Sequence, residues 1–175
     1  MTSRGERGGL IEPLGAHDRS AFSCGASLLD RYLREQATQD IKRLLASCLV
    51  LVEKSTNTLA GYYTLSASSI CASDLPAETS KRLPRYPVFP AALIGRLAID
   101  QKFQRRGLAS ALLAEAAKRA LKGDAKAFAL IVDAKDENAV AFYRLQGFRP
   151  FASRPMSLFL PLGTAKKGSE AELLH

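Results

Sequence analysis

A basic, glycine-containing turn between an apolar stretch and a helical pattern constrains the fold of this 175-residue chain most strongly. The stretch AALIGRLAID, residues 91–100, is apolar enough for a buried strand, and residues 108–122 have the spacing of a helix that ends near Gly123. Between them lies QRRG, residues 104–107, so the local order is strand, turn and helix. The first backbone amides of a helix lack acceptors within the helix, and the helix dipole is positive there. This order predicts an anion site at the turn.

The residue types in the turn suit the close approach of an anion. Gly107 has no Cβ to hold a ligand away from the backbone, and Ala109 and Ser110 are small. Arg105 and Arg106 add positive charge. The spacing differs from that of a nucleotide triphosphate-binding loop and from the three-glycine dinucleotide fingerprint. The turn alone is also consistent with a solvated surface loop, so other features have to decide.

Composition indicates a globular protein with an anionic partner. With 47% hydrophobic residues, the chain is expected to form one domain, residues 1–175, with a frayed tail from about residue 163. The net charge of +8 favours a nucleic acid, a polyphosphate, an acidic protein or a membrane surface. The three cysteines lack C-x-x-C spacing, which indicates neither a disulfide framework nor a metal site. No stretch has the length of a membrane span or the apolar core of a signal peptide, so we expect a cytoplasmic protein.

The remaining patterns alternate between strands and helices. The predicted segments are an apolar start at 10–14, one long or two short helices over 27–45, hairpin strands at 47–54 and 59–72, an irregular proline-rich connection at 73–90, a strand at 127–134, a helix within 136–147 and short strands at 148–151 and 156–162. Ser27 with Asp30 resembles a capping box. Asp136 is expected to be the N-cap of the last helix, and Gly147 lies past its end.

Two motifs resemble the signatures of the GNAT superfamily of N-acetyltransferases. QRRGLA, Gln104 to Ala109, lies on the strand-to-helix turn, and ENAVAFYRLQGF, Glu137 to Phe148, matches the second motif at its Phe-Tyr and Gly-Phe positions. The resemblance implies the GNAT fold, an α/β (α+β) fold. In this fold a mixed, mostly antiparallel central sheet has helices on both faces and strands that splay apart at the acetyl-CoA site.

A finer resemblance extends from His17 to about Leu162. Residues 17–40, 60–67, 83–100 and 142–151 resemble the bacterial GNAT toxins of type II toxin-antitoxin pairs. The resemblance implies an enzyme that transfers the acetyl group of acetyl-CoA to the amino group of aminoacyl-tRNA and so blocks translation. It also implies inhibition by a ribbon-helix-helix antitoxin, a homodimer and no membrane partner.

The resemblance places a cofactor site on the first motif and the strand before it. The backbone of the turn would hold the pyrophosphate of acetyl-CoA, and the strand would offer backbone groups to the pantetheine arm. The turn residues are Gln104, Arg105, Arg106, Gly107, Leu108, Ala109 and Ser110, and the strand residues are Leu97, Ala98 and Ile99. Asn138 matches a position that often hydrogen-bonds the cofactor, or it is only a helix cap.

Tyr143 is expected to be the general acid. A phenol with a pKa near 10 stays protonated at neutral pH and can return a proton to a departing thiolate of similar basicity. The alternative is that Tyr143 is an aromatic anchor between helix and sheet, since Phe142 and Leu145 flank it.

The sequence offers no general base at the expected place. GRLAI, residues 95–99, lacks the carboxylate that many lysine-acetylating relatives have there, and Glu115 and Asp133 have no motif support. A lysine amine is less than roughly 0.1% neutral at pH 7, whereas an α-amine is about 10–20% neutral. The missing base therefore favours an α-amine, as in aminoacyl-tRNA, over lysine.

Basic residues are candidates for contact with tRNA phosphates. They are Lys42, Arg43, Lys81, Arg82, Arg85 and Arg96. The segment KRLPRYP, residues 81–87, joins basic side chains to Tyr86 in an irregular loop, which suits RNA, although each charge taken alone fits a solvated surface better. Two alternative functions stay open: a GNAT enzyme for a small amine or protein N-terminus, and a non-catalytic module that binds nucleic acid or a partner.

Overall fold

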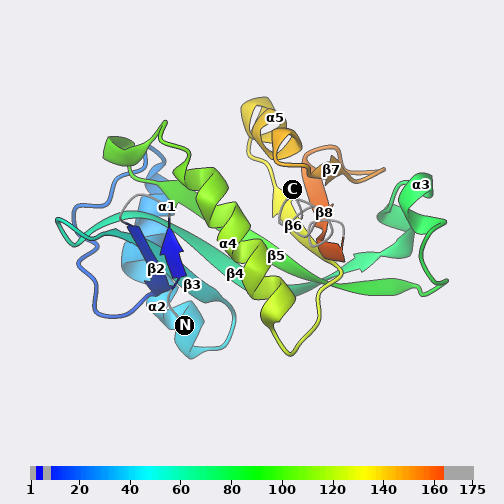
Figure 1. Ribbon diagram of the computed structural model, residues 1–175, viewed down its shortest axis with the longest axis horizontal. Coiled ribbons are helices and arrows are strands. Elements are labelled where there is room, and N and C mark those ends of the chain that lie inside the picture. Colours follow the sequence, from blue (N-terminus) through cyan, green and yellow to red (C-terminus); the bar gives the residue numbers. More distant parts are fainter. Residues whose placement is uncertain (1–2, 6–8, 164–175) are drawn as a thin grey trace, which may run out of the picture. The chain divides into compact units, whose positions relative to one another are not determined.

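The structure, a computed structural model, describes residues 3–5 and 9–163, so most of the predicted frayed tail lies outside the described residues. The chain divides into two compact units. The first comprises Met1–Ser66 with Gly95–Ala116, and the second comprises Ala67–Ile94 with Ala117–His175. Strands β4 (Thr58–Cys71) and β5 (Val88–Ile99) and helix α4 (Leu108–Lys122) each contribute to both units (Figure 1).

Antiparallel strands form the sheet of the first unit. Its strands besides β4 and β5 are β1 (Ser3–Gly5), β2 (Gly9–Pro13) and β3 (Ser47–Glu53). Strand β3 lies between β2 and β4, with Leu51 opposite Ile11 on one side and Gly61 on the other. Five consecutive residues of β3 are buried, as expected for a central strand covered on both faces. The predicted β3–β4 hairpin is confirmed.

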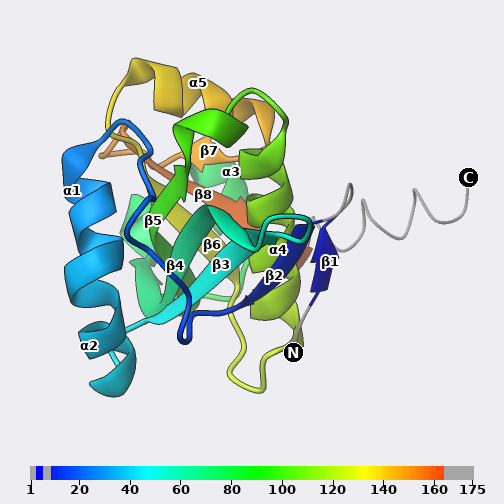
Figure 2. The same cartoon turned by 90° about the vertical axis from the view of Figure 1, so that its left-hand side faces the viewer.

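Helices cover both faces of this sheet within the first unit (Figure 2). Adjacent residues of a strand point to opposite faces of the sheet, and two adjacent tyrosines of β4 contact the helices on the two faces. The Tyr62 hydroxyl donates to the carbonyl of Leu29 at 2.7 Å, and the Tyr63 hydroxyl donates to the carboxylate of Glu115 on α4. Glu115 is therefore engaged in the packing of α4 on the sheet.

One helical run of three parts lies on the Tyr62 face. It consists of α1 (Ser27–Arg31), the π-helical turn η1 (Tyr32–Gln36) and α2 (Ala37–Lys42). Two expectations about it are wrong. Asp30 accepts from the amide of Cys24 at 2.8 Å, and no side chain caps the helix at Ala26, so there is no capping box. The helix ends before Leu44, which has a φ of 61° and is 92% exposed.

The second unit has a mixed sheet. Its elements besides β4, β5 and α4 are η2 (Ala72–Asp74), α3 (Ala77–Ser80), β6 (Ala129–Asp133), α5 (Glu137–Leu145), β7 (Arg149–Pro150) and β8 (Ser157–Pro161). Strand β6 pairs parallel with β5 over Ala91–Ile94 and antiparallel with β8. Since the remaining strand pairs described are antiparallel, the prediction of a mixed, mostly antiparallel sheet is confirmed.

The N-cap and the glycine predicted at the two ends of α5 are confirmed. Asp136 caps α5 by accepting from the amide of Ala139 at 2.8 Å, and Gly147 follows the helix with a φ of 97°.

The prediction for the proline-rich connection is partly corrected. Residues 73–90 were expected to be irregular, but they contain α3 and the start of β5. Pro76 immediately precedes α3, and Pro90 lies within β5, where its carbonyl accepts from the amide of Phe128. Prolines at such positions are compatible with both elements.

The described residues contain no helix that is both long and apolar enough to span a bilayer. Cys24, Cys48 and Cys71 are free thiols, and burial raises the pKa of the Cys48 thiol to about 12. Within the same residues, no three or more His, Cys, Asp or Glu side chains are grouped as metal ligands would be.

Candidate active site

The turn before α4 has the backbone geometry of an anion site. Arg105 and Gly107 both have positive φ, 65° and 75°, and a Cβ added at Gly107 would meet no atom within 4 Å. The carbonyl of Gly107 accepts from the amide of Ala111, so the preceding helical amides have no acceptor within the helix. These amides belong to Leu108, Ala109 and Ser110. The turn is exposed and open, which fits the pyrophosphate of acetyl-CoA.

Hydrogen bonds to a distant segment of the chain hold the turn in place. Asp100 is only 4% exposed, and its carboxylate accepts from the amides of Ser23 (3.0 Å) and Lys102 (2.9 Å). The amide group of Gln104 donates to the carbonyls of Cys24 and Ile99, both at 2.9 Å. The side chain of Gln104 therefore supports the turn, and only its backbone is left as a candidate ligand group. Asp100 could not be recognised from the sequence as a supporting residue, because its partner Ser23 lies far away along the chain.

Asp100→Asn is expected to lower the free energy of unfolding by about 1–3 kcal/mol, because an amide has one acceptor oxygen for the two part-buried backbone donors that the carboxylate binds. Asp18→Asn is the matched control, since Asp18 also accepts from a nearby amide but is exposed. Denaturant unfolding of both variants checks this. Equal stability of the Asp100 variant and the control would show that the carboxylate does not hold the turn.

The three candidate residues of the strand before the turn differ in burial. Ala98 is buried in the apolar core of the first unit, beside Tyr62 and Leu59, while Leu97 and Ile99 are partly exposed. The parallel pairing of β5 with β6 covers Ala91–Ile94, and β5 continues beyond it to Ile99. The backbone of this last stretch remains the predicted contact for the pantetheine arm.

Tyr143 lies on α5 in an aromatic cluster of the second unit. Its ring makes edge contacts with Phe142 (5.3 Å between centroids) and Phe148 (5.5 Å). Burial and, to a lesser extent, the negative charge of Asp133 raise the pKa of the phenol above its usual value. The phenol is therefore protonated at neutral pH and packed against aromatic rings, which fits both the general acid and the aromatic anchor predicted from the sequence.

Two polar residues precede Tyr143 in the chain, Asp133 at the end of β6 and Asn138 on α5. Asn138 is the second residue of α5 and is exposed, and the cap of that helix is Asp136, so Asn138 is not needed as a cap. The carboxylate of Asp133 accepts from the Ser157 hydroxyl at 2.6 Å. Asn138 therefore remains a candidate for the cofactor.

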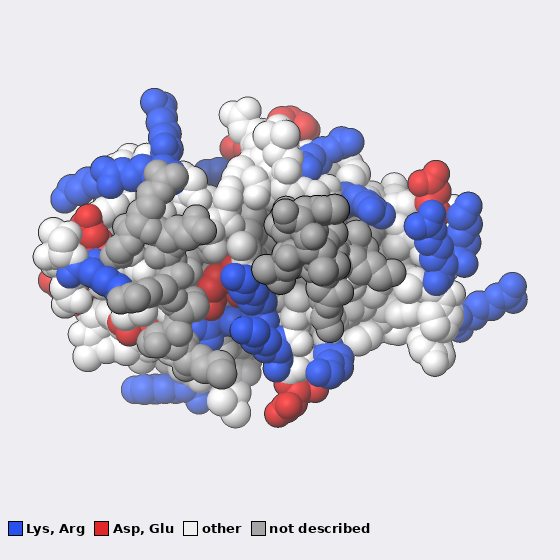
Figure 3. Space-filling view, in the orientation of Figure 1, with Lys and Arg blue, Asp and Glu red and all other residues white. Residues whose placement is uncertain are grey.

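The six basic candidates fall into separate groups. Lys81, Arg82 and Arg85 are exposed in the segment after α3, where Figure 3 shows Lys and Arg side chains gathered. Lys42 and Arg43 are exposed at the end of α2.

Arg96 is held in place by an aromatic ring. Its guanidinium lies 3.6 Å from the ring centroid of Tyr32, and the Tyr32 hydroxyl donates to Asp40 at 2.7 Å. Hydrogen bonds from Gln36 and Tyr32 lower the pKa of Asp40. Arg96 and Tyr32 line a cavity of about 510 Å³ together with Leu28, Leu29, Arg31, Glu35 and Gln36. Tyr32 could not be recognised from the sequence as the partner of Arg96, because its helical spacing indicated only a core residue.

Comparison with known proteins identifies the family. Residues 21–148 match the Acetyltransferase (GNAT) family, and the chain belongs to this family. A probable toxin TacT of Sinorhizobium fredii is 30% identical, over 95% of this chain and 98% of the relative. A tRNA-acetylating toxin of Mycobacterium tuberculosis is 33% identical, over 86% of this chain and 90% of the relative.

Solved structures support the same fold. AtaT complexed with acetyl-methionyl-tRNAfMet is 28% identical and has a TM-score of 0.81, covering 90% of this chain and 97% of that chain. AtaTR bound with AcCoA is 27% identical with a TM-score of 0.74, over 90% and 96% of the two chains. A mutant AtaT toxin bound to the C-terminus of the antitoxin AtaR is 25% identical with a TM-score of 0.74, over 91% and 96%. The GNAT fold expected from the two motifs is therefore confirmed.

Proposed function

We propose that this member of the GNAT family transfers the acetyl group of acetyl-CoA to the amino group of aminoacyl-tRNA and thereby blocks translation. The likeness to tRNA-acetylating toxins over nearly the whole chain is the observation that supports this most strongly. Because the family match spans residues of both units, we propose that they form one domain. The substrate implies action in the cytoplasm, and a ribbon-helix-helix antitoxin is the proposed inhibitor, as AtaR is bound by AtaT. A homodimer stays a prediction.

The turn and the strand before it are the proposed binding site for acetyl-CoA. The backbone of Gln104 to Ser110, with the charges of Arg105 and Arg106, would meet the pyrophosphate. The backbone of Leu97 to Ile99 would bind the pantetheine arm, and Asn138 would add a hydrogen bond. Acetyl-CoA supplies the acetyl group as a thioester.

Tyr143 is the proposed general acid. When the amine nitrogen bonds to the acetyl carbon, the carbon–sulfur bond breaks and the phenol donates its proton to the departing sulfur. The proton lost by the amine passes to water, because no described carboxylate is assigned as a base: Glu115 is bonded to Tyr63, and Asp133 accepts from Ser157. This chemistry requires an acceptor that is partly neutral at pH 7, as an α-amine is.

The rate at low charged-tRNA concentration is expected to rise with pH and to level off as the α-amine loses its proton, near about pH 7.7–8.0. Tyr143 should add no fall in rate up to about pH 9, because its raised pKa keeps the phenol protonated to a higher pH than usual. A pH profile of initial rates between pH 6 and 9 checks this. A rate that declines from pH 7 to 9, after correction for tRNA deacylation, would contradict the assigned roles.

Neutralising Lys81, Arg82 and Arg85 together is expected to raise the KM for charged tRNA and to flatten its salt dependence, since each phosphate contact contributes about 0.7–0.9 to the slope. The affinity for acetyl-CoA should stay the same. The control removes the same number of charges at Lys118, Lys122 and Lys126, which lie outside the candidate site. An identical loss in both triple variants would indicate a general charge effect instead of a binding surface.

Translation in a purified system distinguishes the proposal from its alternatives. We expect inhibition only when acetyl-CoA is present. An enzyme for small amines would not inhibit, and a non-catalytic RNA-binding module would inhibit equally without acetyl-CoA. Either of these outcomes would exclude the proposed function.

A further inference from the structure

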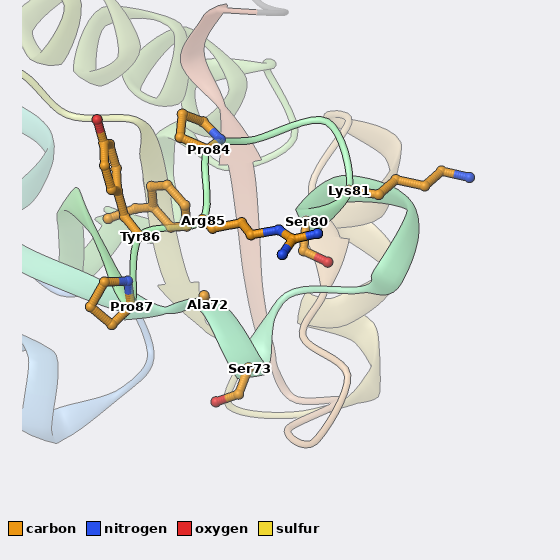
Figure 4. A pocket seen from close by; sticks show the side chains of 9 residues that line it. Ala72, Ser73, Ser80, Lys81, Pro84, Arg85, Tyr86 and Pro87 are labelled. Atoms are coloured by element: carbon orange, nitrogen blue, oxygen red, sulfur yellow. The ribbon is translucent and has the colours of Figure 1, made fainter.

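A cavity of about 510 Å³ opens beside α3, in the second unit, and none of its lining residues belongs to the motifs assigned to acetyl-CoA. Its lining comprises Ala72, Ser73, Ser80, Lys81, Pro84, Arg85, Tyr86, Pro87 and Phe89 (Figure 4). This volume lies within the range of about 300–1,000 Å³ that is typical of small-molecule sites. The cavity is thus large enough to accept one flat ring with its substituents.

An aromatic side chain stands at this cavity with its surface largely exposed. Tyr86 is 61% exposed, and its ring lies 6.2 Å from that of the buried Phe89, which in turn lies 5.5 Å from Phe128. The amide of Tyr86 donates to the carbonyl of Pro84 at 2.8 Å, and the carbonyl of Pro87 accepts from Ala72 at 2.9 Å. Two prolines and these hydrogen bonds restrict the backbone on both sides of the ring, so a stacking partner would meet an ordered platform.

The charge at the cavity is positive. Lys81 and Arg85 belong to its lining, and none of the nine lining residues, all of them in the described part of the chain, is acidic. In Figure 4 the Arg85 side chain extends in the direction of Ser80, while Lys81 points outward. Two acids lie near the lining along the chain, and neither belongs to it: Asp74 is paired with Arg154 at 3.5 Å, and Glu78 is exposed on α3. An anionic ligand therefore finds Arg85 in the cavity and Lys81 at its rim, without a competing carboxylate in the lining.

We propose that this cavity binds one unpaired nucleotide of the tRNA, with its base stacked on Tyr86 and its phosphate at Arg85. Stacking on an exposed aromatic ring beside a cation is how proteins hold single-stranded RNA, and a paired base could not enter such a cavity. The inference rests on the proposed function, since the RNA is the substrate tRNA. It goes beyond phosphate contacts, because a stacked base contributes affinity that salt does not screen.

The test measures the affinity of the full chain for fluorescently labelled, uncharged tRNA at salt concentrations between about 50 and 200 mM. Tyr86→Leu is expected to weaken binding by about 5- to 150-fold, the effect of one lost stacking contact, without changing the salt slope. Tyr86→Phe keeps the ring and should bind within about twofold of the original protein. The control, Val88→Ala, alters an exposed apolar residue nearby that is outside the lining and should have no effect.

Arg85→Gln separates the phosphate contact from the stacking contact. It should reduce the salt slope by about 0.7–0.9, as expected for one lost phosphate contact, whereas Tyr86→Leu should not. A short single-stranded RNA and a duplex of the same sequence serve as further probes. The original protein should prefer the single strand, and Tyr86→Leu should lose that preference. Circular dichroism of each variant verifies that it is folded.

Unchanged tRNA and single-strand binding by folded Tyr86→Leu would overturn the inference, and so would an equal loss in Tyr86→Phe. If Tyr86→Leu instead weakened only the complex with the antitoxin, the cavity would be a protein-binding site. Acetylation of charged tRNA by the original protein is measured separately. Its failure would refute the proposed function, while binding of the single-stranded RNA would still decide the role of the cavity.

Discussion

Replacing Tyr143 with phenylalanine is expected to lower the rate of acetyl transfer by about 10²- to 10⁴-fold, the usual contribution of a positioned acid. The affinity for acetyl-CoA should change by only a few-fold, because only the hydroxyl is lost and the ring keeps its contacts with Phe142 and Phe148. Single-turnover kinetics with charged tRNA, together with calorimetry for acetyl-CoA, separate the two quantities.

The matched control for this variant is Ser153→Ala, which removes an exposed hydroxyl elsewhere in the same unit. It should transfer acetyl groups at close to the original rate. A nearly normal rate in the Tyr143 variant would leave Tyr143 as an aromatic anchor between helix and sheet. An equal fall in both variants would indicate that loss of either hydroxyl disturbs the protein generally.

Replacing Gly107 with valine is expected to weaken acetyl-CoA binding at least about tenfold, or about 1.4 kcal/mol. At a φ of 75° a β-branched residue is strained, and its side chain would occupy the open space that the pyrophosphate is proposed to approach. Isothermal calorimetry with acetyl-CoA measures the loss, and thermal unfolding measures the accompanying change in stability.

Gly107→Asn distinguishes obstruction from backbone strain. Asparagine tolerates a positive φ better than valine does, yet its side chain still projects into the approach. If obstruction dominates, both variants should bind acetyl-CoA weakly, and Gly107→Asn should keep more of the stability. Unchanged affinity in folded Gly107→Val would contradict the assignment of the turn as the anion site.

Sequence patterns predicted those parts of the fold whose partners lie a few residues apart. The cap of α5 by Asp136 and the glycine after that helix follow from short-range geometry, and both are present. The predicted capping box at Ser27 failed, because Asp30 accepts from Cys24 instead. A sequence pattern shows which backbone donors lie near a carboxylate along the chain, but it does not show which of them the carboxylate binds.

The supporting contacts of the site could not be predicted, because they join distant segments. Asp100 and Gln104 bind the loop at Ser23 and Cys24, and Arg96 lies on the ring of Tyr32. Each pair becomes visible only when the sheet brings β5 beside the N-terminal segments of the first unit. The motif residues themselves were found from the sequence, since the turn and α5 carry them on contiguous stretches.

Mass spectrometry of the aminoacyl end of charged tRNA, after incubation with the protein and acetyl-CoA, tests the central proposal most directly. The account predicts that the aminoacyl group gains one acetyl group on its α-amine, that uncharged tRNA binds comparably but does not react, and that Tyr143→Phe yields little product in the same time. Unmodified charged tRNA, together with acetylation of a small amine or a protein N-terminus at the same enzyme concentration, would contradict it.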